Sequence, residues 1–272
     1  MFVQYMSDTQ SILSIRRHIR PADRSVTVLP DDLFITSYPR SGNTWVRFLV
    51  ANLVWADTTT TFLNIDGRIP GIHGFSDVYL SRLPRPRILK SHDCFDPRYP
   101  RVLYVVRDVR SVVVSYYSFL VRRGRIDASL PYPQFTRAFL RGDLDSYGSW
   151  RDHVLSWTRT RAGDHDRFCL LRYEDLQRAE MRTTREIVTF LELERTDDQL
   201  ETAIRQSSFG TMSKSAGEAG QKWKGNRNLR VDGIPFMRSG ALSDWQETLD
   251  EESLELLRGA CEDALQELGY QW

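Results

Sequence analysis

The amino-acid sequence predicts an α/β fold: a single domain with a central parallel β-sheet flanked by helices. Apolar runs of strand length alternate along the chain with segments whose apolar residues recur at helical spacing. Such alternation produces parallel strands covered on both faces, with ligands at the carboxyl ends of the strands. No linker separates two cores, so we expect one domain over residues 31–272, preceded by an irregular arm over residues 1–30.

The composition is that of an ordinary globular protein, with 41% hydrophobic and 27% charged residues among 272. A formal net charge of +1 supplies no field that would draw the chain to nucleic acid or to a membrane. The three cysteines are too widely spaced for a disulfide framework or a metal site, and no long apolar segment predicts a signal peptide or membrane span. We therefore expect a cytoplasmic protein.

The first apolar run, residues 33–35, leads into a turn with Pro39 and Gly42, and residues 45–54 carry an apolar stripe at helical spacing. This order of strand, loop and helix places unpaired N–H groups and the positive end of the helix dipole at the loop. Arg40 adds a permanent charge, and Gly42 allows the backbone to approach an anion closely. This P-loop-like stretch predicts a phosphate cradle, although the same residue types also gather at ordinary helix caps. It is not a Walker A loop, because no Gly-Lys-Ser/Thr follows a four-residue spacer.

The remaining elements follow from the same patterns. Further strands are predicted at residues 87–90, 102–106 and 168–172. Helices are predicted at residues 109–122, 150–160, 182–191, 199–206 and 251–268. The less regular stretches are residues 57–86, expected to be loop with one short helix, residues 124–147 of mixed character, and residues 213–235, expected to be a mobile flap.

Polar side chains follow three of the predicted strands at the point where each strand ends. His92 comes just after the second strand, and Arg107 just after the third. Because carboxyl ends of parallel strands meet at one edge of the sheet, these groups can converge on the first loop. His92 could be a general base, and Arg107 with Ser115 could hold a second phosphate. The alternatives are a structural histidine and a surface salt bridge between Arg107 and Asp108.

Seven motifs in a single order resemble segments of the cytosolic-type sulfotransferases. Residues 36–45, Thr-Ser-Tyr-Pro-Arg-Ser-Gly-Asn-Thr-Trp, are similar to that family's 5′-phosphosulfate loop, and residues 102–117 resemble its 3′-phosphate segment. The further matches are residues 90–92, 147–154, 172–176, 207–212 and 236–245. The chain thus resembles a sulfotransferase that depends on 3′-phosphoadenosine 5′-phosphosulfate (PAPS), in particular a bacterial one.

The resemblance implies transfer of the sulfuryl group of PAPS to a hydroxyl or amine of a small-molecule acceptor, without a metal, leaving 3′-phosphoadenosine 5′-phosphate (PAP). It implies that His92 is the catalytic base. The other implied catalytic residues are Arg40, Lys90 and Ser115. The implied contacts of the 5′-phosphosulfate are Arg40, Ser41, Gly42, Asn43 and Thr44. The other implied nucleotide contacts are Trp45, Arg107, Ser115, Tyr173, Ser208, Phe209, Arg238, Ser239 and Gly240.

The chain departs from the family pattern at three places. Arg40 stands where the family commonly has lysine, so a role as proton donor is doubtful there. Residues 238–240 read Arg-Ser-Gly instead of Arg-Lys-Gly, one cation fewer at the 3′-phosphate. Residues 246–255 do not match the family's short dimer motif, so that mode of dimerisation is not supported. His153 lies in a matching motif, but among tryptophans on a helix it is expected to be structural.

The acceptor is where sequence patterns give least information. A phenol, alcohol, glycoside or natural product would enter between residues 57–86, 119–147 and 213–235. Aromatic residues in and near these stretches are candidate walls: Phe75, Tyr79, Phe119, Tyr132 and Trp223. Two other functions remain open: a nucleotide-binding regulator with this fold but no turnover, and an atypical P-loop kinase, which the missing Gly-Lys-Ser/Thr disfavours.

Overall fold

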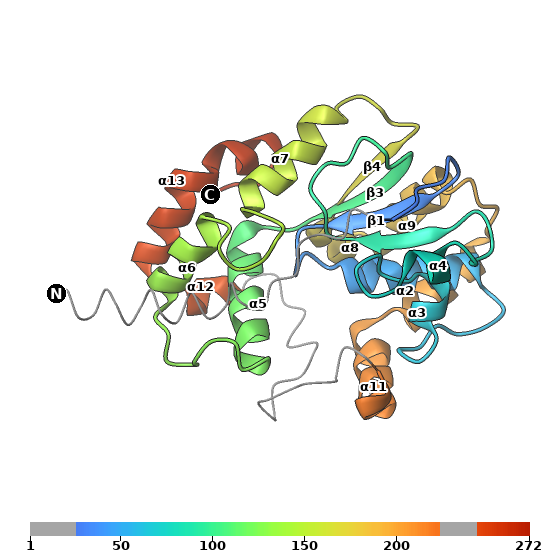
Figure 1. Ribbon diagram of the computed structural model, residues 1–272, viewed down its shortest axis with the longest axis horizontal. Coiled ribbons are helices and arrows are strands. Elements are labelled where there is room, and N and C mark those ends of the chain that lie inside the picture. Colours follow the sequence, from blue (N-terminus) through green and yellow to red (C-terminus); the bar gives the residue numbers. More distant parts are fainter. Residues whose placement is uncertain (1–25, 224–243) are drawn as a thin grey trace.

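The computed structural model describes residues 26–223 and 244–272 (Figure 1). Most of the predicted N-terminal arm therefore lies outside the described residues. The same holds for the second half of the predicted flap and for three predicted nucleotide contacts, Arg238, Ser239 and Gly240. No helix in the described ranges is long and apolar enough to cross a membrane.

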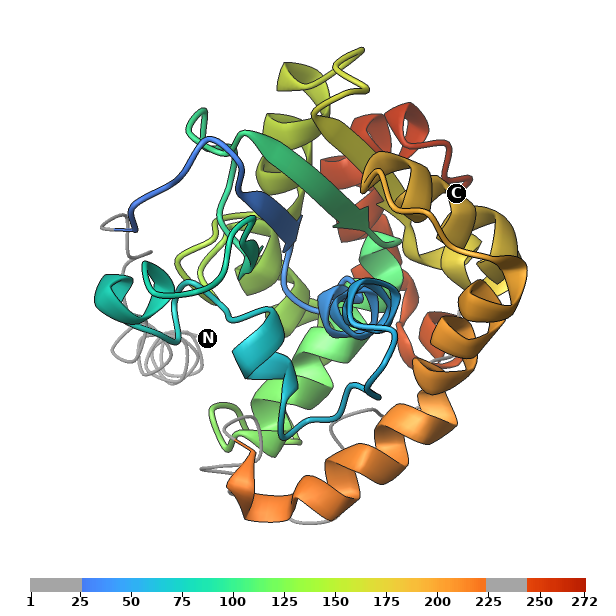
Figure 2. The ribbon, with the colours of Figure 1, turned by 90° about the vertical axis from the view of Figure 1, so that its right-hand side faces the viewer.

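A parallel sheet of four strands forms the centre of the described part of the chain, as predicted (Figures 1 and 2). The strands are β1 (Leu33–Ser37), β2 (Ile88–Ser91), β3 (Arg101–Val106) and β4 (Phe168–Arg172). Their order is β2-β1-β3-β4, and each neighbouring pair is parallel. The chain leaves β1 toward opposite sides to make β2 and β3, and such a switch point is where α/β sheets bind ligands.

Helices cover both faces of the sheet. Their bounds are α2 (Asn43–Val54), α3 (Ile65–Arg68), α4 (Asp77–Leu80), α5 (Val109–Arg122), α6 (Tyr132–Leu140), α7 (Trp150–Thr160), α8 (Tyr173–Arg178), α9 (Glu180–Phe190), α10 (Asp197–Gln206), α11 (Phe209–Ala219), α12 (Asp244–Thr248) and α13 (Glu251–Glu267). Successive side chains of a strand point to opposite faces. Tyr104 of β3 accordingly packs with α5, α7 and α13, whereas its neighbours Leu103 and Val105 pack with α2, α9 and α10.

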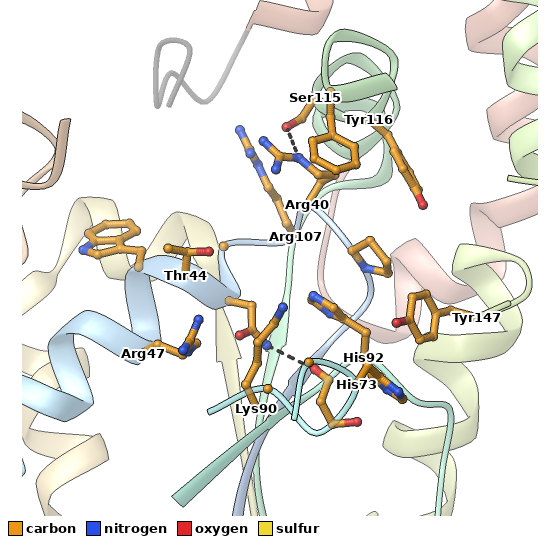
Figure 3. A pocket seen from close by; sticks show the side chains of 18 of the residues that line it. Arg40, Thr44, Arg47, His73, Lys90, His92, Arg107, Ser115, Tyr116 and Tyr147 are labelled. Atoms are coloured by element: carbon orange, nitrogen blue, oxygen red, sulfur yellow. Dashed lines mark hydrogen bonds between the residues drawn. The ribbon is translucent and has the colours of Figure 1, made fainter. Parts of the chain in front are cut away.

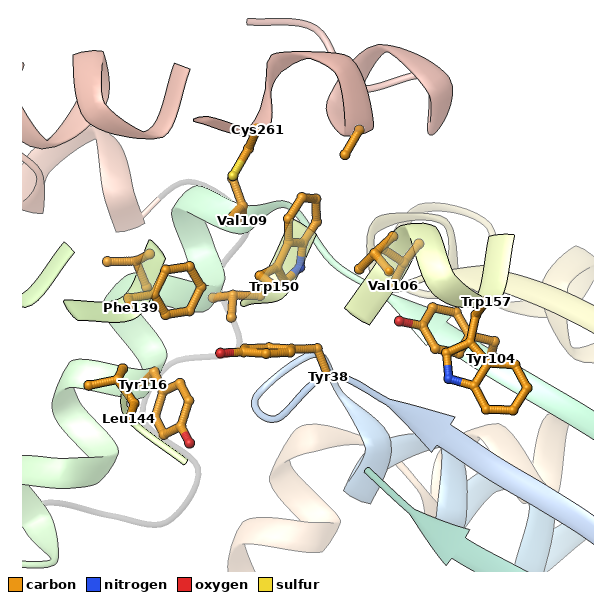
Figure 4. Packing of buried hydrophobic residues seen from close by; sticks show 14 of the residues in the cluster. Tyr38, Tyr104, Val106, Val109, Tyr116, Phe139, Leu144, Trp150, Trp157 and Cys261 are labelled. Atoms are coloured by element: carbon orange, nitrogen blue, oxygen red, sulfur yellow. The ribbon is translucent and has the colours of Figure 1, made fainter. Parts of the chain in front are cut away.

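The first of these cores is rich in aromatic side chains (Figure 4). Trp150 and Trp157 of α7 are fully buried, and Tyr38, just after β1, is 1% exposed. The Tyr38 ring meets His153 edge-on at a centroid distance of 5.5 Å. This packing anchors the loop that follows β1 to the core. Because the core is close-packed, the loop is held rigidly.

The long regular elements agree with the sequence-based prediction to within two residues at each end, and three irregular stretches differ. Residues 57–86 hold two one-turn helices, α3 and α4, and residues 124–147 hold α6. The predicted flap is wrong for residues 213–219, because these complete α11. Ala216 and Ala219 of α11 pack into the second core, but small side chains between glycines give a weak periodic signal.

Candidate active site

A cavity of about 480 Å³ lies at the carboxyl ends of the four strands (Figure 3). Its wall brings together most of the residues that the sequence singled out: Arg40, Gly42, Asn43, Thr44, Trp45, Lys90, His92, Arg107, Ser115, Tyr173 and Phe209. The expected convergence of the strand ends is therefore found. Within the described ranges the wall carries five cationic side chains, Arg40, Arg47, Lys90, Arg107 and Arg123, against one carboxylate, Asp66. This excess of positive charge favours an anionic ligand.

The loop after β1 has an unusual backbone. Both Arg40, with φ 71°, and Gly42, with φ 98°, adopt left-handed conformations. A Cβ atom on Gly42 would lie 2.4 Å from Cδ2 of Tyr173, so only glycine fits beneath this ring. Helix α2 begins at the next residue without a side-chain cap. The loop thus presents the uncapped start of a twelve-residue helix to the cavity, an arrangement suited to phosphate or sulfate.

Two polar residues of this loop are turned toward the protein interior. Nδ2 of Asn43 donates to the carbonyl of Ile35 and to Oγ of Ser37, each at 3.2 Å. Asn43 can therefore offer an anion its backbone N–H but not this side-chain nitrogen. Ser41 is fully buried and is not part of the cavity wall. The backbone N–H of Ser41 donates to the carbonyl of Tyr38 at 3.3 Å. The role of both residues as contacts of the phosphosulfate stays a prediction.

Arg40 is held on the cavity wall by α5. Its Nε donates to Oγ of Ser115 at 3.2 Å, and its guanidinium lies 4.9 Å from the ring centroid of Phe119. Burial, with a smaller contribution from the nearby Arg107, lowers the pKa of Arg40 to about 10. The side chain therefore remains a cation at neutral pH, fixed in place by a hydroxyl and an aromatic face.

Arg107, Tyr173 and Trp45 form a stack at the ends of β3 and β4. The Arg107 guanidinium lies 4.2 Å from the centroid of the Tyr173 ring, and Trp45 meets that ring edge-on at 5.4 Å. The Asp108 carboxylate caps α5 and pairs with Arg110 at 2.6 Å. A cation beside flat aromatic faces suits a phosphorylated purine nucleotide, because the rings can contact a base while the cation contacts a phosphate.

His92 has a defined tautomer. Its Nδ1 lies 2.7 Å from the carbonyl oxygen of Ser37, which can only accept a hydrogen bond, so Nδ1 carries the proton. Nε2 is consequently unprotonated in the neutral ring and is the nitrogen that can take a proton. Burial, and after it the charge of Lys90, hold the pKa of His92 well below its ordinary value, so the ring is neutral at pH 7.

His153 supports His92 from the core. It is fully buried, its Nδ1 lies 2.8 Å from the hydroxyl of Tyr104, and its Nε2 lies 2.9 Å from the carbonyl oxygen of His92. Burial lowers the pKa of His153 to about 4. With both nitrogens engaged and no surface on the cavity, His153 is structural, as the sequence predicted.

Lys90 enters the cavity from the end of β2 (Figure 3). Burial, and after it the positive charge of Arg47, lower the pKa of Lys90 to about 7, while Asp66 acts in the opposite direction. Arg47 itself pairs with Asp66 at 3.0 Å. Lys90 is thus about half protonated at pH 7, because its site penalises the charged form, and an arriving anion would favour that form.

Several wall residues were not found from the sequence. No role in the site is predicted from the sequence for any of them: Arg47, Asp66, His73, Tyr116, Arg123 and Tyr147. Of the five aromatic candidates for the acceptor side, Phe75, Phe119 and Trp223 line the cavity. Tyr79 and Tyr132 are absent from the described wall, because Tyr79 stacks on Phe75 at 4.8 Å and Tyr132 on Tyr117 at 4.5 Å.

Ser208 is the other predicted nucleotide contact that does not reach the wall. Its hydroxyl caps α11, accepting from the N–H of Thr211 and pairing with that residue's hydroxyl at 2.9 Å. No cluster of three or more histidine, cysteine, aspartate or glutamate side chains that could hold a metal ion is found among residues 26–223 and 244–272.

The fold and the cavity together define an α/β protein whose cavity, at the switch point of a parallel sheet, suits an anionic ligand. The sequence model of the sulfotransferase domain matches residues 30–269, and the chain belongs to this family. Among curated proteins it is 30% identical over 234 residues to Sulfotransferase 1 family member D1 of Mus musculus, which covers 80% of this chain and 77% of the relative. It is 27% identical over 243 residues to Sulfotransferase 1B1 of Canis lupus familiaris, with the same two coverages. The chain is accordingly a sulfotransferase, an enzyme that transfers sulfuryl groups.

Solved structures show the same fold. Mouse sulfotransferase SULT7A1 complexed with PAP has a TM-score of 0.70 at 22% identity, covering 89% of this chain and 91% of that one. Retinol dehydratase in complex with androsterone and inactive cofactor PAP has a TM-score of 0.76 at 18% identity, covering 97% of this chain and 88% of that one.

Proposed function

We propose that this sulfotransferase uses PAPS as its donor and that His92 removes the proton from the acceptor hydroxyl or amine. The observation that carries the proposal is the contact between Nδ1 of His92 and the Ser37 carbonyl at 2.7 Å. It leaves Nε2 as a proton acceptor on the wall of a cavity that also holds an anion cradle. General bases of this kind contribute about 10²- to 10⁴-fold to a rate.

The described residues fit the donor. The uncapped start of α2 and the guanidinium of Arg40 suit the 5′-phosphosulfate, and Lys90 adds a cation from the neighbouring strand. Arg107 suits the 3′-phosphate, with the rings of Tyr173 and Trp45 beside the adenine. The tight contact between Gly42 and the Tyr173 ring supports this assignment, because a side chain at Gly42 would displace the ring that we place beside the adenine. Further contacts from Arg238, Ser239 and Gly240 belong to the proposal but lie outside the described residues.

Each residue then has a task in the reaction. The donor supplies the sulfuryl group. Nε2 of His92 takes the acceptor proton as the acceptor atom attacks sulfur, and the neutral ring needs no prior deprotonation. Arg40 and Lys90 stabilise the negative charge that grows on the oxygen of the departing phosphate, which is the task that fixed cations and N–H dipoles perform best in a water-poor site. Ser115 positions the Arg40 guanidinium through the contact at 3.2 Å.

The acceptor in this proposal is a small molecule with a hydroxyl or amine, such as a phenol, alcohol or glycoside. Phe75, Phe119 and Trp223 supply apolar surface on the wall. Retinol dehydratase, which has the same fold, has been solved in complex with androsterone. We place the enzyme in the cytoplasm, with neither nucleic acid nor membrane as a partner and without a metal.

The replacement His92→Ala tests the proposal. We expect transfer to fall by at least about 10²-fold while the affinity for PAP stays within twofold, because the base acts only in the chemical step. His165→Ala, at an exposed histidine outside the cavity wall, is the matched control and should leave both quantities unchanged. Turnover near the wild-type rate in His92→Ala would show that another group is the base.

A further inference from the structure

His73 lies on the cavity wall but belongs to none of the motifs and takes no part in the proposed reaction. It sits in the loop between α3 and α4, on the same side of the cavity as His92 and Tyr147 (Figure 3). Its side chain is 24% exposed, so a ligand in the cavity can reach it. Histidine in a loop that borders the acceptor side of a cavity is a candidate for ligand recognition.

One nitrogen of His73 is already engaged. Nε2 lies 3.0 Å from Oδ1 of Asp93. Asp93 is itself firmly held: Oδ2 accepts from the Tyr99 hydroxyl at 2.9 Å, and its N–H donates to Oγ of Ser91 at 2.9 Å. Burial tends to raise the pKa of Asp93, but His73 and Tyr99 outweigh it and the pKa is lowered. A charged carboxylate thus orients the His73 ring.

The other nitrogen, Nδ1, makes no hydrogen bond within residues 26–223 and 244–272. When Nε2–H points to the carboxylate, Nδ1 of the neutral ring is a hydrogen-bond acceptor. Such an atom recognises an O–H or N–H group of a ligand. His73 and His92 are therefore arranged alike. In each, a protein oxygen contacts one ring nitrogen and leaves the other nitrogen for a ligand.

The distances to Tyr147 show how His73 lies relative to His92, the proposed base. The centroid of the Tyr147 ring lies 5.7 Å from the centroid of His73 and 5.7 Å from that of His92. Both imidazoles therefore lie beside a single phenol ring, and a small molecule that lies against that ring can meet both. Phe75 stands next to His73 on the wall, which favours a flat aromatic body for this molecule.

We propose that His73 recognises a second hydroxyl group of the acceptor, so that the preferred acceptors are aromatic diols and not simple phenols. The proposal rests on the assignment of His92 as the base, because it takes the first hydroxyl to be the one at His92. A hydrogen bond between neutral groups contributes about 0.5–1.5 kcal/mol, which corresponds to a preference of about two- to tenfold. A purely structural His73, which only ties its loop to Asp93, would give no such preference.

The test compares phenol with its 1,2-, 1,3- and 1,4-dihydroxy counterparts as acceptors. In the wild type we expect kcat/KM for at least one diol to exceed that for phenol by about two- to tenfold, after correction for the number of hydroxyls. In His73→Phe, which keeps a ring but removes both nitrogens, the ratio should fall to about one, whatever happens to the absolute rates. His73→Asn can place an amide oxygen near the position of Nδ1 and should restore part of the ratio. The control His165→Phe should keep the wild-type ratio.

Two results would overturn the proposal: a wild-type ratio near one for all three diols, or a ratio that His73→Phe leaves unchanged. Binding of the same compounds to the protein saturated with PAP gives a second readout that needs no turnover. If no phenol is sulfated but the diol still binds more tightly in the wild type and not in His73→Phe, the proposed reaction fails and the recognition by His73 stands. Equal binding of diol and phenol by the wild type contradicts recognition by His73 whether or not transfer occurs.

Discussion

The two halves of the cavity are built differently. The donor half, the part of the wall that we propose for PAPS, consists of the ends of β1, β3 and β4 and the start of α2, all of them joined to buried elements. The acceptor half, the part of the wall that we propose for the acceptor, consists mostly of residues from loops, among them His73, Phe75 and Tyr147, with Phe119 from α5. The donor half is therefore fixed by the sheet itself, whereas the acceptor half depends on contacts between segments far apart in the chain. A family can keep one donor and change acceptors with such a division.

A network of buried hydrogen bonds connects the elements of the donor half. Glu174, next to Tyr173, accepts from the N–H of Asp108 at 3.1 Å and from the hydroxyl of Tyr270 at 2.7 Å. The ends of β3 and β4 and the C-terminal segment are thereby joined at one carboxylate. This network holds the neighbours Arg107 and Tyr173 at their mutual distance of 4.2 Å. From this difference between the two halves we predict that substitutions in the donor half weaken nucleotide binding and leave acceptor binding unchanged.

The largest effect should come from Gly42→Ala. The added Cβ would lie 2.4 Å from the Tyr173 ring, at a φ of 98° that side chains rarely adopt. Strain and overpacking of this kind each cost about 1–3 kcal/mol, so we expect PAP affinity to fall by about 100-fold or more in calorimetric titrations. Gly67→Ala is the control, since nothing lies within 4 Å of its added Cβ. Unchanged PAP affinity in Gly42→Ala would break the assignment of this loop.

Arg107→Ala should weaken PAP by about 10- to 100-fold, because hydrogen bonds to a charged group are worth about 1.5–3 kcal/mol. Adenosine 5′-phosphate, which lacks the 3′-phosphate, should lose little affinity in the same titration. The difference between the two nucleotides is the measurement that matters. Equal losses of affinity for both nucleotides would show that Arg107 does not bind the 3′-phosphate.

The pH dependence of PAP binding should report on Lys90, whose pKa is lowered to about 7. The protonated amine is the form that attracts the nucleotide, so affinity decreases as the pH rises through this value. Between pH 7 and pH 8 the charged fraction of Lys90 falls from a half to about a tenth, and we expect a loss of about fivefold. Lys90→Arg, which stays charged, should make the profile flat over this range. A slope that persists in Lys90→Arg would have another origin.

Tyr270→Phe should produce the smallest effect, and it tests the division between the halves. Loss of the hydroxyl that donates to Glu174 should raise the KM for PAPS about threefold and leave the KM for the acceptor unchanged. Tyr117→Phe is the matched change on the other side, because the Tyr117 hydroxyl donates to the carbonyls of Ala128 and Leu130 in the loop before α6. Tyr117→Phe should change the KM for the acceptor and leave the KM for PAPS unchanged. The opposite pattern in either variant would contradict the division.

The donor half could be predicted from the sequence because its residues are neighbours in the chain or follow directly from strand ends. The positions of Arg40, residues 42–45 and Arg107 on the cavity wall follow once the parallel sheet is recognised. What could not be predicted there is orientation: the Asn43 side chain turns inward, and Gly42 is required by a ring 131 positions away in the sequence.

The acceptor half could largely not be predicted from the sequence, because its contacts join residues that are far apart in the chain. His73 contacts Asp93, and Tyr116 donates to Asp145, a half-buried carboxylate whose pKa is raised to about 6 by desolvation. None of these pairs has a spacing that a helix or strand would impose, so periodicity gives no signal for them. Helix α11 was missed for a related reason: its buried face is made of small side chains.

The account as a whole is tested most directly by a transfer assay without added metal, with labelled PAPS as donor and a panel of phenols, diols, glycosides, steroids and peptidic natural products as acceptors. We expect the label to appear in at least one acceptor, with one equivalent of PAP formed for each sulfated product. Tight PAP binding with no transfer across the panel would point to a nucleotide-binding regulator. ATP turnover that requires Mg²⁺, in place of PAPS-dependent transfer, would contradict the account and point to a kinase.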